Sequence, residues 1–255
     1  MSAASATDGL GQHATLRVVL ISAAAALGGF LFGFDTAVIN GAVDAIRAHF
    51  GLNAGEIGFA VSCALLGSAL GAWYAGMLAN RFGRVRTMQV AAVLLVVAAL
   101  GSGLAVAVWD LVLWRLVGGV GVGVASVIAP TYIAEVAPAR IRGRLGSMQQ
   151  LAIVLGIFAA LLSDAWLADA AGGAASMLWL GLPAWRWMFL AAVTPAVIYG
   201  LLVLAVPESP RHLVAKGRMA EARVVLQKVL AMHSVAALDS KLGDIEASLR
   251  SEHKP

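Results

Sequence analysis

The sequence predicts an all-α membrane protein with six transmembrane helices and short cytoplasmic helices. Hydrophobic residues make up 60% of the chain and charged residues only 13%, a composition typical of membrane proteins. The apolar residues gather in six runs of about 20 residues, the length that a helix needs to cross a hydrocarbon core of ~30 Å. The strands of a β-barrel would be about half as long and would alternate in polarity, so the runs do not fit a barrel.

Short polar segments separate the six runs. The runs cover residues 18–39, 57–79, 87–108, 111–133, 145–167 and 187–206. The first run is too long for the apolar part of a signal peptide, contains Asp35 and lacks a small-residue cleavage site. We therefore expect a cytoplasmic N-terminal tail at residues 1–17 and a six-helix bundle at residues 18–206.

The distribution of basic residues predicts the orientation, because Lys and Arg in short loops stay on the cytoplasmic side. Arginines cluster between the second and third runs and between the fourth and fifth: Arg81, Arg84, Arg86, Arg140, Arg142 and Arg144. The opposite loops are expected to hold Asp44, Glu56, Asp110, Asp164 and Asp169, with only Arg47 and Arg186 as cations. Both termini are then cytoplasmic. This topology and anionic lipid headgroups account for the net charge of +4 without a nucleic-acid partner.

After the sixth run the composition becomes polar. Pro207 and Pro210 end the membrane helix. Beyond Lys216, apolar residues recur at helical spacing in two stretches. The first contains Met219, Ala222, Leu226, Val229 and Leu230, and the second contains Leu238, Leu242, Ile245 and Leu249. We expect residues 207–255 to be a cytoplasmic helical segment, with the chain ending before a second bundle.

The remaining patterns argue against an enzyme. A glycine-rich stretch at residues 121–126 lies within an apolar run and follows no predicted strand, so it is not a dinucleotide loop. No nucleophile elbow, phosphate-binding loop or paired carboxylates occur, and no cofactor is expected. Cys63 stands alone, which excludes a disulfide framework and indicates a small buried residue. The histidines show no metal-ligand spacing: His13, His49, His212, His233 and His253.

Small residues four positions apart let membrane helices approach closely. Three such pairs occur: Gly29 with Gly33, Gly67 with Gly71, and Gly119 with Gly123. Two charges also lie deep in the apolar runs, Asp35 in the first and Arg115 in the fourth. Opposite charges in one bundle cost far less when paired than when alone. Because the first run of each group of three carries one of them, they are also a weak sign of an inverted repeat.

Three stretches resemble the sugar porters of the major facilitator superfamily between residues 27 and 213. They are GGFLFGFDTAVINGA, RLVGGVGVGVASVIAPTYIAEVAPARIRGRLGSMQQLAIVLG and VPESPRHL. GMLANRFGRVR also resembles the signature between the second and third helices, with Asn80 where aspartate is usual and Val85 in place of an arginine. The resemblance implies a sugar transporter that works by alternating access. The chain would be the N-terminal half-bundle of a major facilitator fold in the plasma (cytoplasmic) membrane.

The resemblance also implies how the buried charges act. In proton-coupled members, the aspartate of FGFD takes up the coupling proton beside the arginine of the fourth helix, which gives these roles to Asp35 and Arg115. Protonation would neutralise Asp35, loosen its hold on Arg115 and favour one orientation of the bundle. A static structural pair is the alternative. Facilitative members usually carry asparagine here, so Asp35 favours symport over facilitated diffusion.

Substrate contacts follow from the same resemblance. Gln150 matches a glutamine whose amide both donates to and accepts from sugar hydroxyls. Gln149 would point about 100° away around the helix and is the weaker candidate. Phe32 matches an aromatic residue near the sugar, with ordinary helix packing as the alternative. Ile157 stands where some proton-coupled members have a second glutamine. The resemblance therefore does not identify which sugar is preferred.

The resemblance further implies a cytoplasmic latch of ion pairs that closes the inside of the transporter, with a solvated loop as the alternative. Its candidates are Arg81, Arg84, Glu135, Arg144, Glu208 and Arg211.

A complete porter of this kind has two six-helix halves with the sugar between them. We therefore expect as partners a sugar, a proton, membrane lipid and a second six-helix half. Three explanations account for the missing half. In order of preference they are a truncated or split gene, assembly with a separately encoded half, and self-dimerisation. A non-transporting remnant or regulatory subunit, and a porter of other small polar solutes, are the alternatives.

Overall fold

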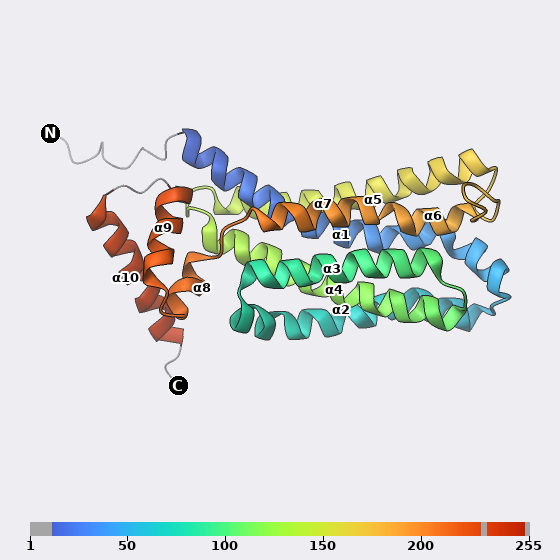
Figure 1. Ribbon diagram of the computed structural model, residues 1–255, viewed down its shortest axis with the longest axis horizontal. Coiled ribbons are helices and arrows are strands. Elements are labelled where there is room, and N and C mark those ends of the chain that lie inside the picture. Colours follow the sequence, from blue (N-terminus) through green and yellow to red (C-terminus); the bar gives the residue numbers. More distant parts are fainter. Residues whose placement is uncertain (1–11, 231–233, 253–255) are drawn as a thin grey trace.

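The computed structural model describes residues 12–230 and 234–252, which form ten helices and no strand (Figure 1). The helices are α1 (Gln12–Phe50), α2 (Ala54–Phe82), α3 (Arg84–Leu104), α4 (Val108–Val136), α5 (Arg142–Ala171), α6 (Ala184–Ala191), α7 (Val193–Leu204), α8 (Pro210–Ala215), α9 (Met219–Leu230) and α10 (Val235–Glu252). Helices α1 to α7 run along the long axis of the molecule, and α8 to α10 lie at one end. Residues 1–11 of the expected N-terminal tail, with His233 and His253, lie outside the described residues.

Six segments of the described chain are long and apolar enough to cross a membrane, so the predicted six-helix class is confirmed. Helices α1 to α5 each provide one span, and α6 and α7 together provide the sixth. The sixth span is divided because Pro195 has no N–H to donate to the carbonyl of Ala191. Ala192 instead donates to the carbonyl of Phe189 at 3.1 Å, which tightens the turn.

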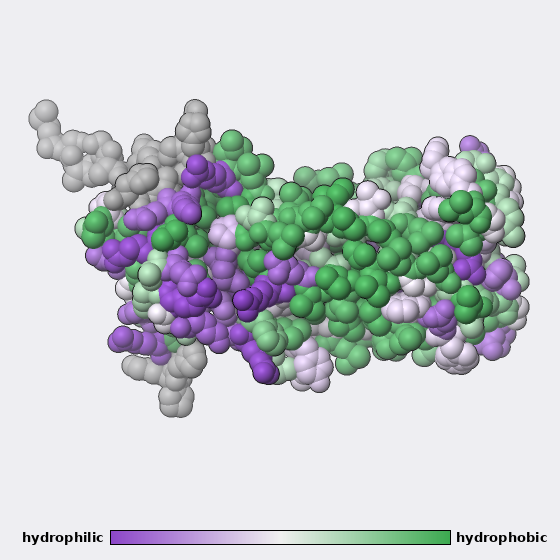
Figure 2. All heavy atoms as spheres, in the orientation of Figure 1, coloured by the Kyte–Doolittle hydropathy of each residue, from purple (hydrophilic) through white to green (hydrophobic). Residues whose placement is uncertain are grey.

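On the face that Figure 2 shows, apolar side chains cover most of the bundle, whereas hydrophilic residues concentrate around α8 to α10. Large exposed side chains of the spans include Leu65, Trp73, Phe158, Leu201 and Leu204. The same end of the molecule receives the start of α1, where Arg17 Nη1 donates to the carbonyl of Lys228 in α9 at 3.0 Å. An even number of spans thus returns the chain to the side from which it started.

Helices α1 and α5 both continue past their apolar runs, which corrects the expected loops. Helix α1 continues to Phe50, so Asp44 and Arg47 lie on its exposed surface and not in a loop. Helix α5 continues to Ala171, and its Asp164 is buried against Gly41 of α1. A Cβ atom added to Gly41 would lie 2.6 Å from Asp164 Oδ2. The projecting ends of the two helices pack on each other, and this packing buries the carboxylate.

Four further charges expected in loops are also helical. Asp169 is exposed near the end of α5. Glu56 and Asp110 lie in the first turns of α2 and α4, where carboxylates accept free backbone N–H groups. Arg186 is buried in α6, where Nη1 donates to the carbonyl of Gly103 at 3.2 Å and the guanidinium lies 4.7 Å from the centre of the Trp185 ring. Arg186 therefore ties α6 to α3.

Glycines make the two most extensive helix pairs possible, α1 with α5 and α2 with α4. A Cβ atom at Gly33 would lie 2.0 Å from the carbonyl oxygen of Ile153, and one at Gly156 would lie 2.0 Å from that of Phe30. Between α2 and α4, four glycines would place a Cβ atom within 2.2 Å of a backbone carbonyl oxygen: Gly67, Gly71, Gly119 and Gly123. The predicted role of the glycine pairs in close helix packing is confirmed.

Candidate functional site

A charged pair joins α1 to α4 inside the bundle. Arg115 Nη1 donates to Asp35 Oδ1 at 2.9 Å and also lies 3.4 Å from the carbonyl oxygen of Asp35. The Arg115 side chain is 3% exposed and that of Asp35 is 23% exposed. The guanidinium also lies 5.8 Å from the centre of the Phe189 ring in α6. The two intramembrane charges predicted to pair are thus in direct contact.

A small cavity of about 140 Å³ lies beside this pair, between α1, α2 and α4. Its polar and aromatic lining comes from Phe32, Asp35, Thr36, Asn40, Ser68 and Arg115. The structure therefore brings Phe32 to the charged pair. Thr36 and Asn40 were missed, although they follow Phe32 at intervals of four residues and so share its face of the helix. That periodicity is the signal that could have found them.

The two glutamines of α5 lie apart from the cavity lining. Gln149 is buried against α1, where a Cβ atom at Gly29 would lie 2.6 Å from its Nε2 atom. Gln150 is exposed on α5. The two side chains therefore occupy different faces of the helix. The exposed side chain, and not the buried one, is accessible to a molecule outside this bundle.

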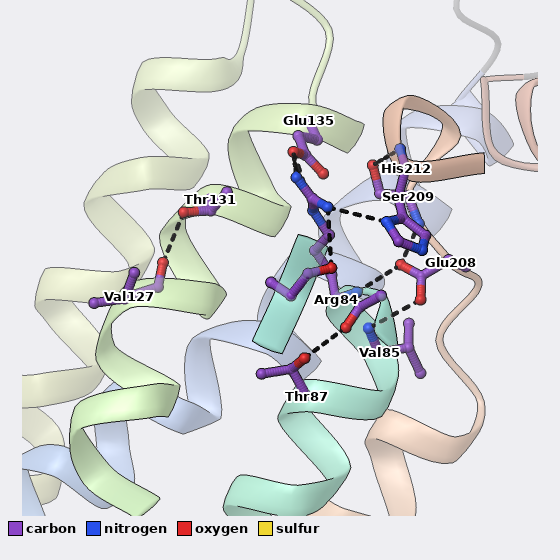
Figure 3. Close-up of polar contacts among 11 residues, drawn as sticks. Arg84, Val85, Thr87, Val127, Thr131, Glu135, Glu208, Ser209 and His212 are labelled. Atoms are coloured by element: carbon purple, nitrogen blue, oxygen red, sulfur yellow. Dashed lines mark hydrogen bonds and ion pairs between the residues drawn. The ribbon is translucent and has the colours of Figure 1, made fainter. Parts of the chain in front are cut away.

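A second polar site lies where α3, α4 and α8 meet, and we call it the Arg84 cluster: Arg84, Glu135, Glu208 and His212 (Figure 3). Arg84 Nη2 forms an ion pair with Glu135 Oε1 at 2.8 Å, and Nε donates to the same oxygen at 3.2 Å. Arg84 Nη1 lies 3.3 Å from the carbonyl oxygen of Ala79 and 3.1 Å from His212 Nδ1. One guanidinium thus links the end of α2, α4 and α8.

Glu208 completes the cluster by accepting from the backbone. Oε1 accepts from the N–H of Arg84 at 3.0 Å, and Oε2 accepts from the N–H of Val85 at 3.3 Å, so this carboxylate caps the start of α3. Gly83, directly before α3, has φ 98°, and a Cβ atom there would lie 2.2 Å from Glu208 Oε2. Glycine is required both for the backbone conformation and for room for the carboxylate.

Two neighbouring contacts hold the segment that carries Glu208. The Tyr132 hydroxyl of α4 donates to the carbonyl of Pro207 at 2.7 Å. Ser209 is fully buried and lies at the N-cap of α8, with its Oγ atom 3.5 Å from the N–H of His212. The turn between α7 and α8 therefore places Glu208 and His212, which lie one helical turn apart, on Arg84.

Not all of the predicted latch residues join the cluster. Arg81 is exposed at the end of α2, and its guanidinium lies 5.3 Å from the centre of the Phe82 ring. Arg144 is exposed at the start of α5 and makes no ion pair with any described residue. Arg211 is partly buried and lines a larger cavity of about 700 Å³ beneath α4, α9 and α10. His212 was missed because its place in α8, and not any ligand spacing, brings it to Arg84.

Glu208→Ala should lower the thermal unfolding temperature. The change removes the acceptors of two partly buried N–H groups at the start of α3, and the loss of such a cap costs about 0.5–2 kcal/mol. Glu208→Gln, which keeps one acceptor oxygen, should lose less. Glu221→Ala is the matched control, because Glu221 is exposed and its ion-pair partner among the described residues is the exposed Arg218, three positions earlier. Equal unfolding temperatures for Glu208→Ala and Glu221→Ala would contradict the capping role.

Comparisons with known proteins agree with this architecture. A family model described as "Sugar (and other) transporter" matches residues 21–254. The chain is 55% identical over 239 residues to the glucose transport protein of Synechocystis sp., covering 93% of this chain and 50% of that protein. It is 37% identical over 245 residues to the D-xylose-proton symporter of Escherichia coli, covering 86% of this chain and 49% of that protein.

A solved structure of the proton:xylose symporter XylE bound to 6-bromo-6-deoxy-D-glucose superposes with a TM-score of 0.85 and 35% identity. This superposition covers 93% of the present chain and 54% of the XylE chain. The chain thus spans about half the length of the relatives that it matches. The match over nearly all of its spans and over the helices at their end shows that the chain belongs to the sugar transporter family of the major facilitator superfamily.

Proposed function

We propose that this chain is the N-terminal half of a proton-coupled sugar transporter that works by alternating access. The observation that carries the proposal is the Asp35–Arg115 pair beside a cavity inside a membrane-spanning bundle. Ionisable residues at such positions are expensive and usually serve a pathway for ions or substrate. The names of two relatives, a glucose transport protein and a D-xylose-proton symporter, support the same substrate and coupling.

The two partners of the pair are suited to different tasks. Asp35 lines the cavity and is partly exposed, so a proton can reach its carboxylate. Arg115 is almost fully buried and cannot lose its charge, so it is a fixed cation in α4. A proton on Asp35 removes the attraction between α1 and α4 at this point. Arg115 then keeps the ring of Phe189 and the carbonyl of Asp35 as neighbours, which lowers the cost of releasing the carboxylate.

The cavity beside the pair is smaller than the ~300 Å³ at which ligand pockets usually begin. We propose that a second six-helix half completes the sugar site. Phe32, Thr36 and Asn40 would present one face of α1 to the sugar, and Gln150 would add the amide of α5. An exposed amide in a membrane-spanning helix is costly against lipid, and it is satisfied if it faces a polar site between two halves.

The Arg84 cluster would lie on the cytoplasmic side of the plasma membrane, with both termini. The arginines between α2 and α3 and between α4 and α5 support this orientation, because positive loops stay inside. We propose that the cluster is part of the latch that keeps the inside closed. Lipid would surround the apolar outer surface of the spans.

The test is uptake into proteoliposomes with and without an inward proton gradient, using labelled hexoses and pentoses. The chain would be assayed alone and joined to the C-terminal half of the Synechocystis relative, with that relative's own N-terminal half as the matched control. We expect uptake only by the joined protein and faster uptake with the gradient. No uptake by a folded and inserted fusion whose control is active would refute the transporter assignment and favour a non-transporting remnant or subunit.

A further inference from the structure

The contact between Arg84 and His212 defines the protonation state of the histidine. Arg84 Nη1 lies 3.1 Å from His212 Nδ1. A guanidinium only donates hydrogen bonds and stays charged at any pH that a protein tolerates, so Nδ1 must accept. The imidazole is therefore neutral, with its proton on Nε2. A protonated ring would turn an N–H of its own toward the N–H of Arg84, and the hydrogen bond would be lost.

Charged groups of several elements act on this ring. Arg84 of α3, Glu135 of α4 and Glu208 of the turn before α8 lie in the same cluster (Figure 3), and the exposed Lys216 directly after α8 adds a further positive charge. Burial is the main cause that lowers the pKa of His212, since the charged imidazole would lose its hydration. The carboxylates of Glu208 and Glu135 act in the opposite direction, and the charges of Arg84 and Lys216 add to the lowering of the pKa.

We propose that neutral His212 is a positioning residue for Arg84, and that its protonation by an acidic cytoplasm breaks the Arg84–His212 bond and loosens the Arg84 cluster. The proposal rests on the proposed function only in placing the cluster in the cytoplasm. Among the contacts of the guanidinium, only the hydrogen bond to His212 can be broken by mild acid, because histidine is the partner whose charge changes closest to neutral pH. The ion pair with Glu135 and the contact with the Ala79 carbonyl remain.

Loosening would extend to Glu208. A protonated imidazole attracts the neighbouring carboxylate, which now caps the backbone of Arg84 and Val85. Acid would therefore weaken both the side-chain and the backbone contacts at the start of α3. Because the pKa of His212 is lower in the folded chain than the ordinary value of 6.5, folding favours the neutral ring. The resulting stability is present above pH 6.5 and is lost as the pH falls below it.

The test is hydrogen exchange of the backbone amides of Arg84 and Val85 in the full chain in nanodiscs, expressed as protection factors at pH 7.5 and 5.5. His212→Asn keeps an acceptor oxygen near the place of Nδ1 and does not titrate. His212→Phe keeps a ring without an acceptor. We expect protection in the wild type to fall about tenfold at the lower pH, the loss expected when one hydrogen bond to a charged group is broken. His212→Asn should stay flat, and His212→Phe should be weakly protected at both pH values.

His49→Asn is the matched control, because His49 is exposed near the end of α1 at the opposite end of the bundle. It should keep the pH response of the wild type. A flat wild-type profile, or a His212→Asn profile that falls as the wild type does, would overturn the proposal even if His212→Phe does not fold. The measurement requires no transport. Failure of the uptake experiment with a clear pH response here would therefore refute only the proposed function.

Discussion

Asp35→Asn should abolish the response of sugar uptake to a proton gradient in the fusion of this chain with a second half. Asparagine cannot bind or release a proton in this pH range, yet its amide oxygen can still accept from Arg115 Nη1, now 2.9 Å from Asp35 Oδ1. We therefore expect a folded protein whose uptake is the same with and without the gradient. The measurement is initial uptake of the best sugar of the panel at matched protein amounts.

Two further variants distinguish the loss of proton coupling from the loss of the sugar site or of the fold. Ser68→Ala changes the lining of the same cavity without changing a charge, so uptake should remain gradient-driven. Asp35→Leu removes the acceptor and leaves the buried guanidinium alone, which costs about 3–5 kcal/mol in a fully buried pair and less here because Asp35 is partly exposed. Asp35→Leu should therefore also lose thermal stability. Gradient-driven uptake by Asp35→Asn would rule out Asp35 as the proton carrier.

Gly33→Leu should prevent the bundle from folding, and Gly33→Ala should destabilise it strongly. Even the first carbon of a side chain at this position would lie 2.0 Å from the carbonyl oxygen of Ile153. The obstacle is backbone, which cannot rotate away as a side chain can, so α1 and α5 would have to separate. Overpacking of this kind typically costs about 1–3 kcal/mol and occasionally more. The readout is thermal unfolding of purified protein together with its elution profile in detergent.

Gly76→Ala is the matched control, since no atom of another helix lies within 4 Å of a Cβ atom built there in α2. Alanine is a better helix former than glycine, so this variant should be as stable as the wild type or more stable. If Gly33→Ala and Gly76→Ala unfold at the same temperature, the α1–α5 crossing is not as close as described.

The spans could be predicted from the sequence because every helix that crosses a membrane must be a long and mainly apolar segment, and such segments are visible in the sequence. Their ends could not. The hydropathy of a segment indicates only which residues can lie in lipid. Helices α1 and α5 continue past their apolar runs because they pack on each other, and this packing buries Asp164. The division of the sixth span follows from Pro195, which was visible in the sequence but lies within an otherwise unbroken apolar run.

The candidate sites could be predicted where the residues themselves show a chemical requirement, such as the pairing of buried charges. Asp35 and Arg115 carry opposite charges within apolar helices, so their pairing was expected. The contact between Arg84 and His212 joins residues 128 positions apart and depends on the turn between α7 and α8, which no periodicity reveals. Similarly, the helical angle between Gln149 and Gln150 predicted different environments, but only the packing of α5 on α1 decides which of them is buried.

The glycine crossings relate the two groups of three spans to each other. If α1 to α3 form one unit and α4 to α7 the other, then α1 packs closely on the second helix of the other unit, and α4 does the same in return. The close pairs α1–α5 and α4–α2 would then be equivalent if the two units form an inverted repeat, because in each pair the first helix of one unit packs on the second helix of the other. Neither unit contains its own tightest helix pair. The two groups of spans are therefore interlocked, and we expect the whole six-helix bundle to be the smallest piece of this chain that folds stably.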